Sequence, residues 1–184
     1  MCKARKKILW LAQTAVLLAL LICLQWLTKP LGQLVTGSAV NTVLAIAALF
    51  AGTGSGIAVA LLSPVFAYLF GIAPQLVTVP AIMAGNAILV VQLALFADRT
   101  KGISLWNGVS VVVAAASKAT VLYLLVVQVI CGFASAPLLE QGLLKKPMLT
   151  ALPTMFSWMQ LVTALIGCAL ALLITPVLRK ALKR

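Results

Sequence analysis

A single lysine inside a long apolar stretch is the side chain of this sequence best suited to chemistry. Lys118 lies near the middle of residues 104–133, and a cation at the centre of a bilayer costs about 2.5–3.5 kcal/mol on insertion scales. The only two acids, Asp98 and Glu140, fall in expected loops. We therefore expect Lys118 to face a watery pocket, to meet an anionic group such as a carboxylate, or to be deprotonated. Two structural alternatives stay open: the side chain could snorkel or bond helix carbonyls, or the span could shift toward an interface.

Polar and aromatic side chains in or beside the other apolar stretches could complete such a pocket. In hydrocarbon an amide must find a hydrogen-bonding partner, so these side chains should point inward. We predict that the binding residues, besides Lys118, are Asn86, Asn41, Gln75, Gln33, Gln128, Trp158, Gln160 and Tyr123. The alternative for each amide is a structural bond to a neighbouring helix, and Trp and Tyr also collect at membrane interfaces.

The side chains that most catalysis requires are missing. The sequence has no histidine and no acid within an apolar stretch, so acid–base catalysis, metal binding and Ser-His-Asp chemistry lack their parts. Ser117 and Lys118 are adjacent and do not share a helix face, which disfavours a Ser–Lys hydrolase. We predict that the chain is not an enzyme, has no catalytic residues, holds no metal and carries no cofactor.

The composition indicates an integral membrane protein. The 184 residues are 64% hydrophobic and 9% charged, whereas a soluble domain is about half apolar and a quarter charged. The net charge of +12 comes from bases that flank the apolar runs, which favours juxtamembrane placement over nucleic-acid binding. The length suits one transmembrane domain over residues 1–184.

Six apolar runs predict an all-α membrane protein with six transmembrane helices. The expected spans cover residues 8–27, 35–51, 57–71, 76–97, 104–133 and 149–175. The second and third are short for full crossings. The glycines of residues 52–56 are expected to form a turn, because the P-loop lysine is absent. Pro176 is expected to end the last span.

The distribution of bases predicts that both termini are cytoplasmic. With six spans, ten bases lie inside and three outside, as the positive-inside rule favours. The inner bases are Lys3, Arg5, Lys6, Lys7, Arg99, Lys101, Arg179, Lys180, Lys183 and Arg184; the outer bases are Lys29, Lys145 and Lys146.

The first span carries a face of small residues. Ala12, Ala15 and Ala19 lie along one side of residues 8–27, and Ala15-x-x-x-Ala19 is a small-xxx-small pair. Such a pair lets another helix approach the backbone closely. That helix could belong to a partner protein or to this same chain.

These features together resemble a family. A chain of this length with a basic N-terminus, six spans, the Ala15–Ala19 face and no ATPase domain is similar to the substrate-specificity (S) components of energy-coupling factor (ECF) vitamin transporters. The stretches LAQTAVLLALLICLQWLTKPLGQLVTGSAVN and GIAPQLVTVPAIMAGNAILVV resemble such proteins too. The similarity covers nearly the whole chain.

The resemblance implies a function in transport. An S component binds a vitamin from outside in a pocket near the outer face, which the loop after the first span (residues 28–38 here) helps to cover. It docks through its alanine face, here Ala12, Ala15 and Ala19, on a transmembrane coupling protein. Two cytoplasmic ATPases drive that module, so ATP is used by partner subunits, and the S component topples in the membrane to deliver its ligand. The expected partners are thus the ECF module, a small-molecule vitamin and membrane lipid, and no nucleic acid.

The expected place is the bacterial plasma membrane, as a multi-pass subunit of an ECF-type ABC transporter. Lys118 favours a carboxylate-bearing vitamin or related micronutrient, and folates, pantothenate, biotin and niacin fit equally well. The alternatives are a structural or assembly membrane protein, or a stand-alone facilitator that has no ATPase partner.

Overall fold

The protein is built from helices joined by short connections. The computed structural model describes residues 3–73, 75–98 and 102–182, and none of these forms a strand. The long helices are α1 (Lys3–Thr28), α2 (Gln33–Ile46), α3 (Thr53–Leu69), α4 (Val79–Phe96), α5 (Leu105–Leu122) and α8 (Trp158–Ala181). The shorter elements are η1 (Lys29–Leu31), η2 (Ala47–Ala51), η3 (Leu76–Thr78), η4 (Tyr123–Phe133), α6 (Ser135–Glu140) and α7 (Met148–Phe156). Of these, η2 and η4 are π-helical and continue α2 and α5 without a break.

Five helical segments are long and apolar enough to cross a membrane, within the part of the chain that the structure describes. They are Lys7–Leu31, Gln33–Ala51, Leu76–Phe96, Leu105–Phe133 and Trp158–Ala181. The sixth apolar helix, α3, has 17 residues and is shorter. The all-helical prediction is therefore confirmed, with five to six candidate spans, and the shortness expected of the third span is observed.

The expected last span is divided. Residues 149–175 fall into α7 and α8, which separate at Ser157, where the backbone has φ −96° and ψ −126°. Pro153 lies in α7, and the Ser157 hydroxyl donates to its carbonyl oxygen. Pro176 does not end α8, which continues to Ala181. The predicted end of the last span at Pro176 was therefore wrong. The physical reason is that a proline within a membrane helix is tolerated where neighbours cover the freed backbone groups.

The predicted turn at residues 52–56 is also wrong in its extent. Only Gly52 is in the turn, with a positive φ of 104°, and α3 begins at Thr53. The first turn of α3 packs on α1, because the Thr14 hydroxyl donates to Ser55 Oγ at 2.8 Å and both side chains are buried. This contact fixes the start of a helix where the glycines alone suggest a flexible loop.

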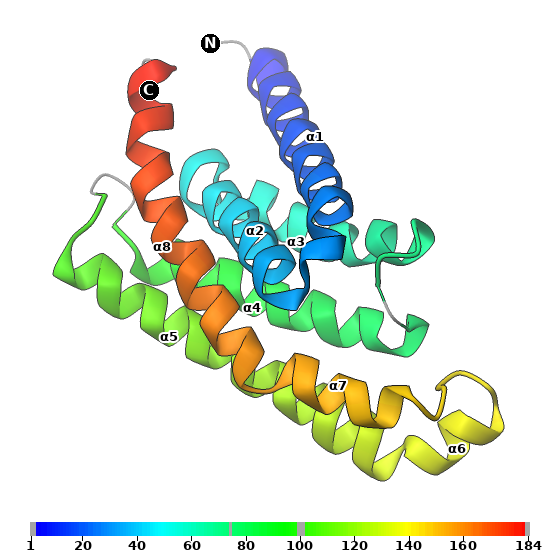
Figure 1. Ribbon diagram of the computed structural model, residues 1–184. Helices are drawn as coiled ribbons and strands as arrows, with labels where there is room; N and C mark the ends of the chain where they lie inside the picture. The colour runs from blue at the N-terminus through cyan, green and yellow to red at the C-terminus, as the bar shows by residue number, and fades with distance from the viewer. Residues whose placement is uncertain (1–2, 74, 99–101, 183–184) are drawn as a thin grey trace.

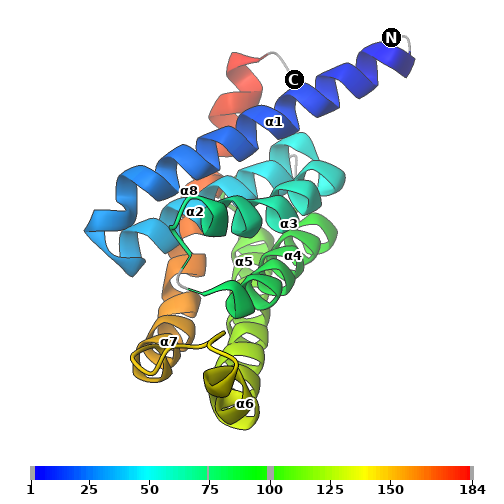
Figure 2. The ribbon, with the colours of Figure 1, turned by 90° about the vertical axis from the view of Figure 1, so that its right-hand side faces the viewer.

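The helices surround two apolar cores. The larger core joins α1, α2, α3, α4, α5 and α8, and α2 packs along α8 over most of its length. The smaller core joins the end of α5, η4, α7 and the start of α4 around Leu122, Leu152 and Phe156. In two perpendicular views, α1 lies along α2 and α3 and apart from α5 (Figure 1, Figure 2). One face of α1 is therefore left without a neighbour among the described residues.

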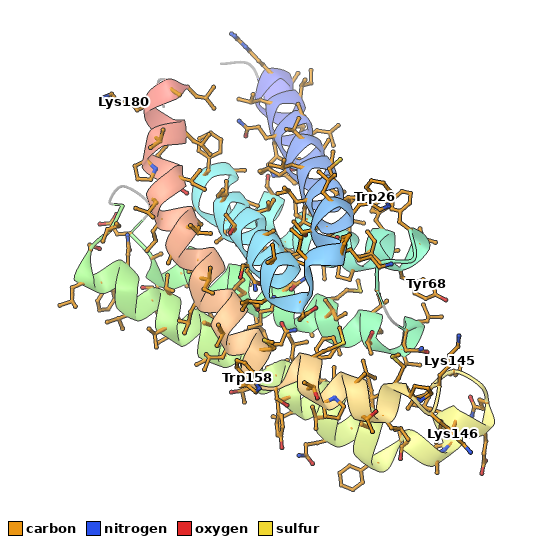
Figure 3. The ribbon with its side chains drawn as sticks, viewed as in Figure 1. Trp26, Tyr68, Lys145, Lys146, Trp158 and Lys180 are labelled. Atoms are coloured by element: carbon orange, nitrogen blue, oxygen red, sulfur yellow. The ribbon has the colours of Figure 1, made fainter. Side chains whose placement is uncertain are left out.

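The start of α1 and the end of α8 lie at the same end of the molecule (Figure 1). There Arg179 donates to the Leu49 carbonyl oxygen at 2.7 Å and so ties α8 to η2. Lys180 lies at this end and Lys145 and Lys146 at the other (Figure 3). Four of the bases used to predict topology, Arg99, Lys101, Lys183 and Arg184, lie outside the described residues.

Candidate functional site

A cavity of about 280 Å³ lies between α1, η1, α2, α3, α4, α5, α7 and α8. Its wall is largely apolar, with polar side chains from several helices converging on it. The polar lining residues are Gln25, Lys29, Gln33, Thr36, Asn41, Asn86, Lys118 and Gln160. Five of the nine predicted binding residues thus line one cavity: Gln33, Asn41, Asn86, Lys118 and Gln160.

Lys118 is the buried cation of this cavity. It projects from the middle of α5 with 3% of its surface exposed, and its Nζ donates to Asn41 Oδ1 at 2.6 Å and to Asn86 Oδ1 at 2.7 Å. Asn41 lies on α2 and Asn86 on α4, so the lysine joins three helices. An ammonium group has three donors, and two are used within the part of the chain that the structure describes. The third makes no hydrogen bond to the described residues.

The orientation of the Asn41 amide is set by a second hydrogen bond. Asn41 Nδ2 donates to Thr163 Oγ1 at 3.3 Å, and the Thr163 hydroxyl donates to the Gln160 carbonyl oxygen at 3.3 Å. All three residues are buried. Because the amide nitrogen is held by α8, the amide oxygen faces Lys118. A polar network therefore runs from α8 through α2 to α5.

Gln160 also stabilises the break between α7 and α8. Its Nε2 donates to the Met155 carbonyl oxygen at 3.0 Å, and its backbone N–H donates to the Ser157 carbonyl oxygen at 3.1 Å. These bonds satisfy backbone groups that the interrupted helix leaves free. The break brings Met155 and Phe156 into the cavity wall beside Gln160.

The connection after α1 forms another part of the wall. Lys29 in η1 donates from Nζ to the Gly71 carbonyl oxygen at 2.7 Å, which joins this connection to the one after α3. The Thr36 hydroxyl donates to the Thr28 carbonyl oxygen at 2.8 Å and so holds the start of α2 against the end of α1. Lys29 and Thr36 line the cavity together with Gln33.

Four of the predicted binding residues lie outside this cavity. Gln128 and Tyr123 are exposed on η4, and Gln128 Nε2 donates to the Tyr123 hydroxyl at 2.9 Å. Trp158 is 62% exposed at the start of α8, and its side chain lies on the outside of the bundle (Figure 3). Gln75 precedes η3, where its carbonyl oxygen accepts from the Thr78 hydroxyl. Their part in binding stays a prediction.

Three polar lining residues, Gln25, Lys29 and Thr36, were not among the predicted binding residues. Gln25 lies in the first span, whose alanine face is the predicted docking surface, and Lys29 is one of the three predicted outer bases. The sequence features of Gln25 and Lys29 could each have indicated a place in the binding site. Gln25 is an amide within an apolar run, the criterion applied to Asn41 and Asn86, and Lys29 lies in the connection expected to cover the pocket.

The predicted docking face of α1 is exposed. Ala12, Ala15 and Ala19 all lie on its outer side, whereas Thr14 and Leu21 face the bundle. The small side chains leave this surface open to another helix. The structure contains one chain, so the identity of that helix stays a prediction.

Comparison with protein families identifies the chain. The model of the ECF transporter, substrate-specific component, matches residues 10–179. The chain belongs to this family. Comparisons with curated proteins and with solved structures find no match. Members of this family are substrate-binding subunits of transporters and not enzymes. Membership in a transporter family and five apolar helices long enough to span a membrane, among the described residues, indicate a multi-pass protein of the plasma membrane.

The cavity of this S component has a positive charge, and no described lining residue carries a counter-charge. Among the described lining residues, the charged side chains are Lys29 and Lys118. Asp98 follows α4 and Glu140 ends α6, and neither lines the cavity. Amide oxygens offset part of the cost of burying Lys118, because hydrogen bonds to a charged group contribute about 1.5–3 kcal/mol each.

Proposed function

We propose that this S component binds a small vitamin or related micronutrient that carries a carboxylate, and takes it up from outside the cell. The buried Lys118, held by two neutral amide oxygens with a third donor available, is the observation that supports this proposal. A carboxylate in the cavity supplies the counter-charge that the described lining residues lack. The surrounding amides Gln33, Asn86 and Gln160 supply polar contacts that select among acids.

Transport requires an energy source from other chains. We propose that the exposed Ala12, Ala15 and Ala19 face docks on a transmembrane coupling protein, that two cytoplasmic ATPases drive this module, and that the S component topples to deliver its substrate. Both termini are then cytoplasmic. The common end of α1 and α8 and the opposite positions of Lys180 and Lys145 support this orientation (Figure 1, Figure 3).

Binding to the purified protein tests the proposal. A thermal-shift screen against folate, pantothenate, biotin and nicotinate identifies an acid, and isothermal titration then compares the wild type with Lys118→Met. We expect the substitution to lower affinity by about 30-fold or more, because loss of a buried charge partner costs about 2 kcal/mol or more. Lys180→Met is the matched control, since the same substitution is made at an exposed position at the far end of α8.

Three results contradict this function. If Lys118→Met binds the acid as the wild type does, the carboxylate does not meet Lys118. If substrate accumulates in membranes that have no ATP and no partner proteins, the chain is a stand-alone facilitator. A purified protein that binds no small molecule favours the structural or assembly alternative.

A further inference from the structure

Gln25 connects α1 to the cavity. Among the described residues of α1, it is the one that lines the cavity. It follows Thr14 and Leu21 on the inward face, one turn after Leu21, and Leu21 is fully buried. The alanines of the outer face lie on other sides of the same helix. Gln25 is thus placed to contact a substrate from a helix whose outer side is free.

The Gln25 amide oxygen receives no hydrogen bond from the part of the chain that the structure describes. This atom, Oε1, is buried. A buried acceptor without a donor is unfavourable. Ser63, Gln92 and Thr175 also have a buried side-chain oxygen without a partner among the described residues, but of these four residues only Gln25 lines the cavity. Lys118 and Asn41, in the same cavity, each make hydrogen bonds within the bundle. The Gln25 oxygen therefore presents an unused acceptor at the cavity wall.

The rest of the wall bears on the shape of the substrate. Phe156 is the one aromatic side chain among the described lining residues. Tyr68, Tyr123 and Trp158, which a flat ring could stack on, lie outside the cavity. The volume of about 280 Å³ lies just below the range of roughly 300–1,000 Å³ for sites of drug-sized ligands. The cavity suits a compact molecule and offers no aromatic pair to clamp a planar one.

We propose that Gln25 binds a hydroxyl or amide N–H of the substrate through its side-chain oxygen. The substrate is then a compact aliphatic acid that carries a hydrogen-bond donor away from its carboxylate. Lys118 on α5 binds the carboxylate and Gln25 on α1 binds the donor. The inference rests on the proposed function, because it takes the acid at Lys118 as given.

The test uses the full chain in detergent and two small acids as probes. Pantothenate is aliphatic and carries hydroxyl groups and an amide N–H, whereas nicotinate is a flat ring without a donor. Isothermal titration measures the affinity of the wild type, Gln25→Met and Gln92→Met for each probe. Methionine retains the length and apolar stem of glutamine and removes the acceptor. Gln92 is the matched control, because its Oε1 is also buried without a donor among the described residues but does not line the cavity.

We expect the wild type to prefer pantothenate to nicotinate. Gln25→Met should lower the affinity for pantothenate about 10-fold, the effect of one lost hydrogen bond, and Gln92→Met should leave it unchanged. Equal affinity of Gln25→Met and the wild type overturns the inference, as does preferred binding of nicotinate. Either result leaves the proposed function standing when Lys118→Met still weakens acid binding, so the two failures are distinguished.

Discussion

Gly167 of α8 lies against Asn41 of α2 so closely that no larger residue fits between the helices. A Cβ at position 167 would lie 2.5 Å from Asn41 Cβ and 2.7 Å from the Ser38 carbonyl oxygen. The second of these contacts is with backbone, which cannot rotate away as a flexible side chain can. The missing side chain at Gly167 therefore sets the distance between α2 and α8, and with it the position of the Asn41 amide that holds Lys118.

Gly167→Ala should damage both stability and binding. The added methyl forces α2 from α8, and overpacking of this kind costs about 1–3 kcal/mol. The displaced Asn41 would no longer make its hydrogen bonds to Lys118 and to Thr163 at the same time. The affinity for the acid should therefore fall as well. Thermal unfolding and isothermal titration of the purified protein measure the two effects.

A glycine on α5 provides the control for this substitution. A Cβ at Gly108 would meet no atom within 4 Å, and alanine is a better helix former than glycine. Gly108→Ala should therefore keep or raise the melting temperature and leave binding unchanged. A Gly167→Ala protein that behaves like Gly108→Ala would show that α2 and α8 do not need this close approach.

The centre of the site could be predicted from the sequence because hydrocarbon leaves a polar group few choices. Lys118 and Asn86 are separated by 32 positions and Lys118 and Asn41 by 77. Each had to point inward to find a partner, and the bundle interior is small enough that they meet. The same rule identifies Gln25, an amide within the apolar run of the first span.

The outer part of the site could not be predicted because its backbone departs from the α-helix. The apolar run predicts a regular helix through residue 133. The observed η4 is π-helical, which changes the residues that share a face of the helix. Gln128 and Tyr123, five positions apart, bond each other there and stay exposed. The break at Ser157 likewise turns Trp158 outward and Gln160 inward. A uniformly apolar run shows neither departure.

The contribution of Lys29 to the affinity for the acid should decrease as the salt concentration rises. Its Nζ is exposed and bonds the Gly71 carbonyl oxygen at the cavity wall, so it attracts an acid through water. Charges exposed to solvent are screened over a Debye length of about 10 Å at 0.1 M salt, and buried ones much less. Lys29→Met should lower affinity about 3- to 10-fold in dilute buffer and by less in concentrated salt.

Titrations across a range of sodium chloride concentrations test this expectation. Lys145→Met is the control, because Lys145 is an exposed base outside the cavity lining. The affinity of this variant for the acid should equal that of the wild type at every salt concentration. If the loss caused by Lys29→Met is the same in dilute and concentrated salt, Lys29 acts by holding the two connections together rather than by its charge.

The alanine face of α1 should separate binding from uptake. Tryptophan at Ala15 or Ala19 fills the surface that a partner helix would approach, yet both side chains point away from the bundle. Uptake of the acid by cells that supply an ECF module should be abolished, while the purified variants bind the acid as the wild type does. Val112→Trp, which places the same bulk on an exposed position of α5, should retain uptake. Normal uptake by both Ala15→Trp and Ala19→Trp would show that the partner docks on another helix. Loss of binding would show that the outer face of α1 supports the cavity itself.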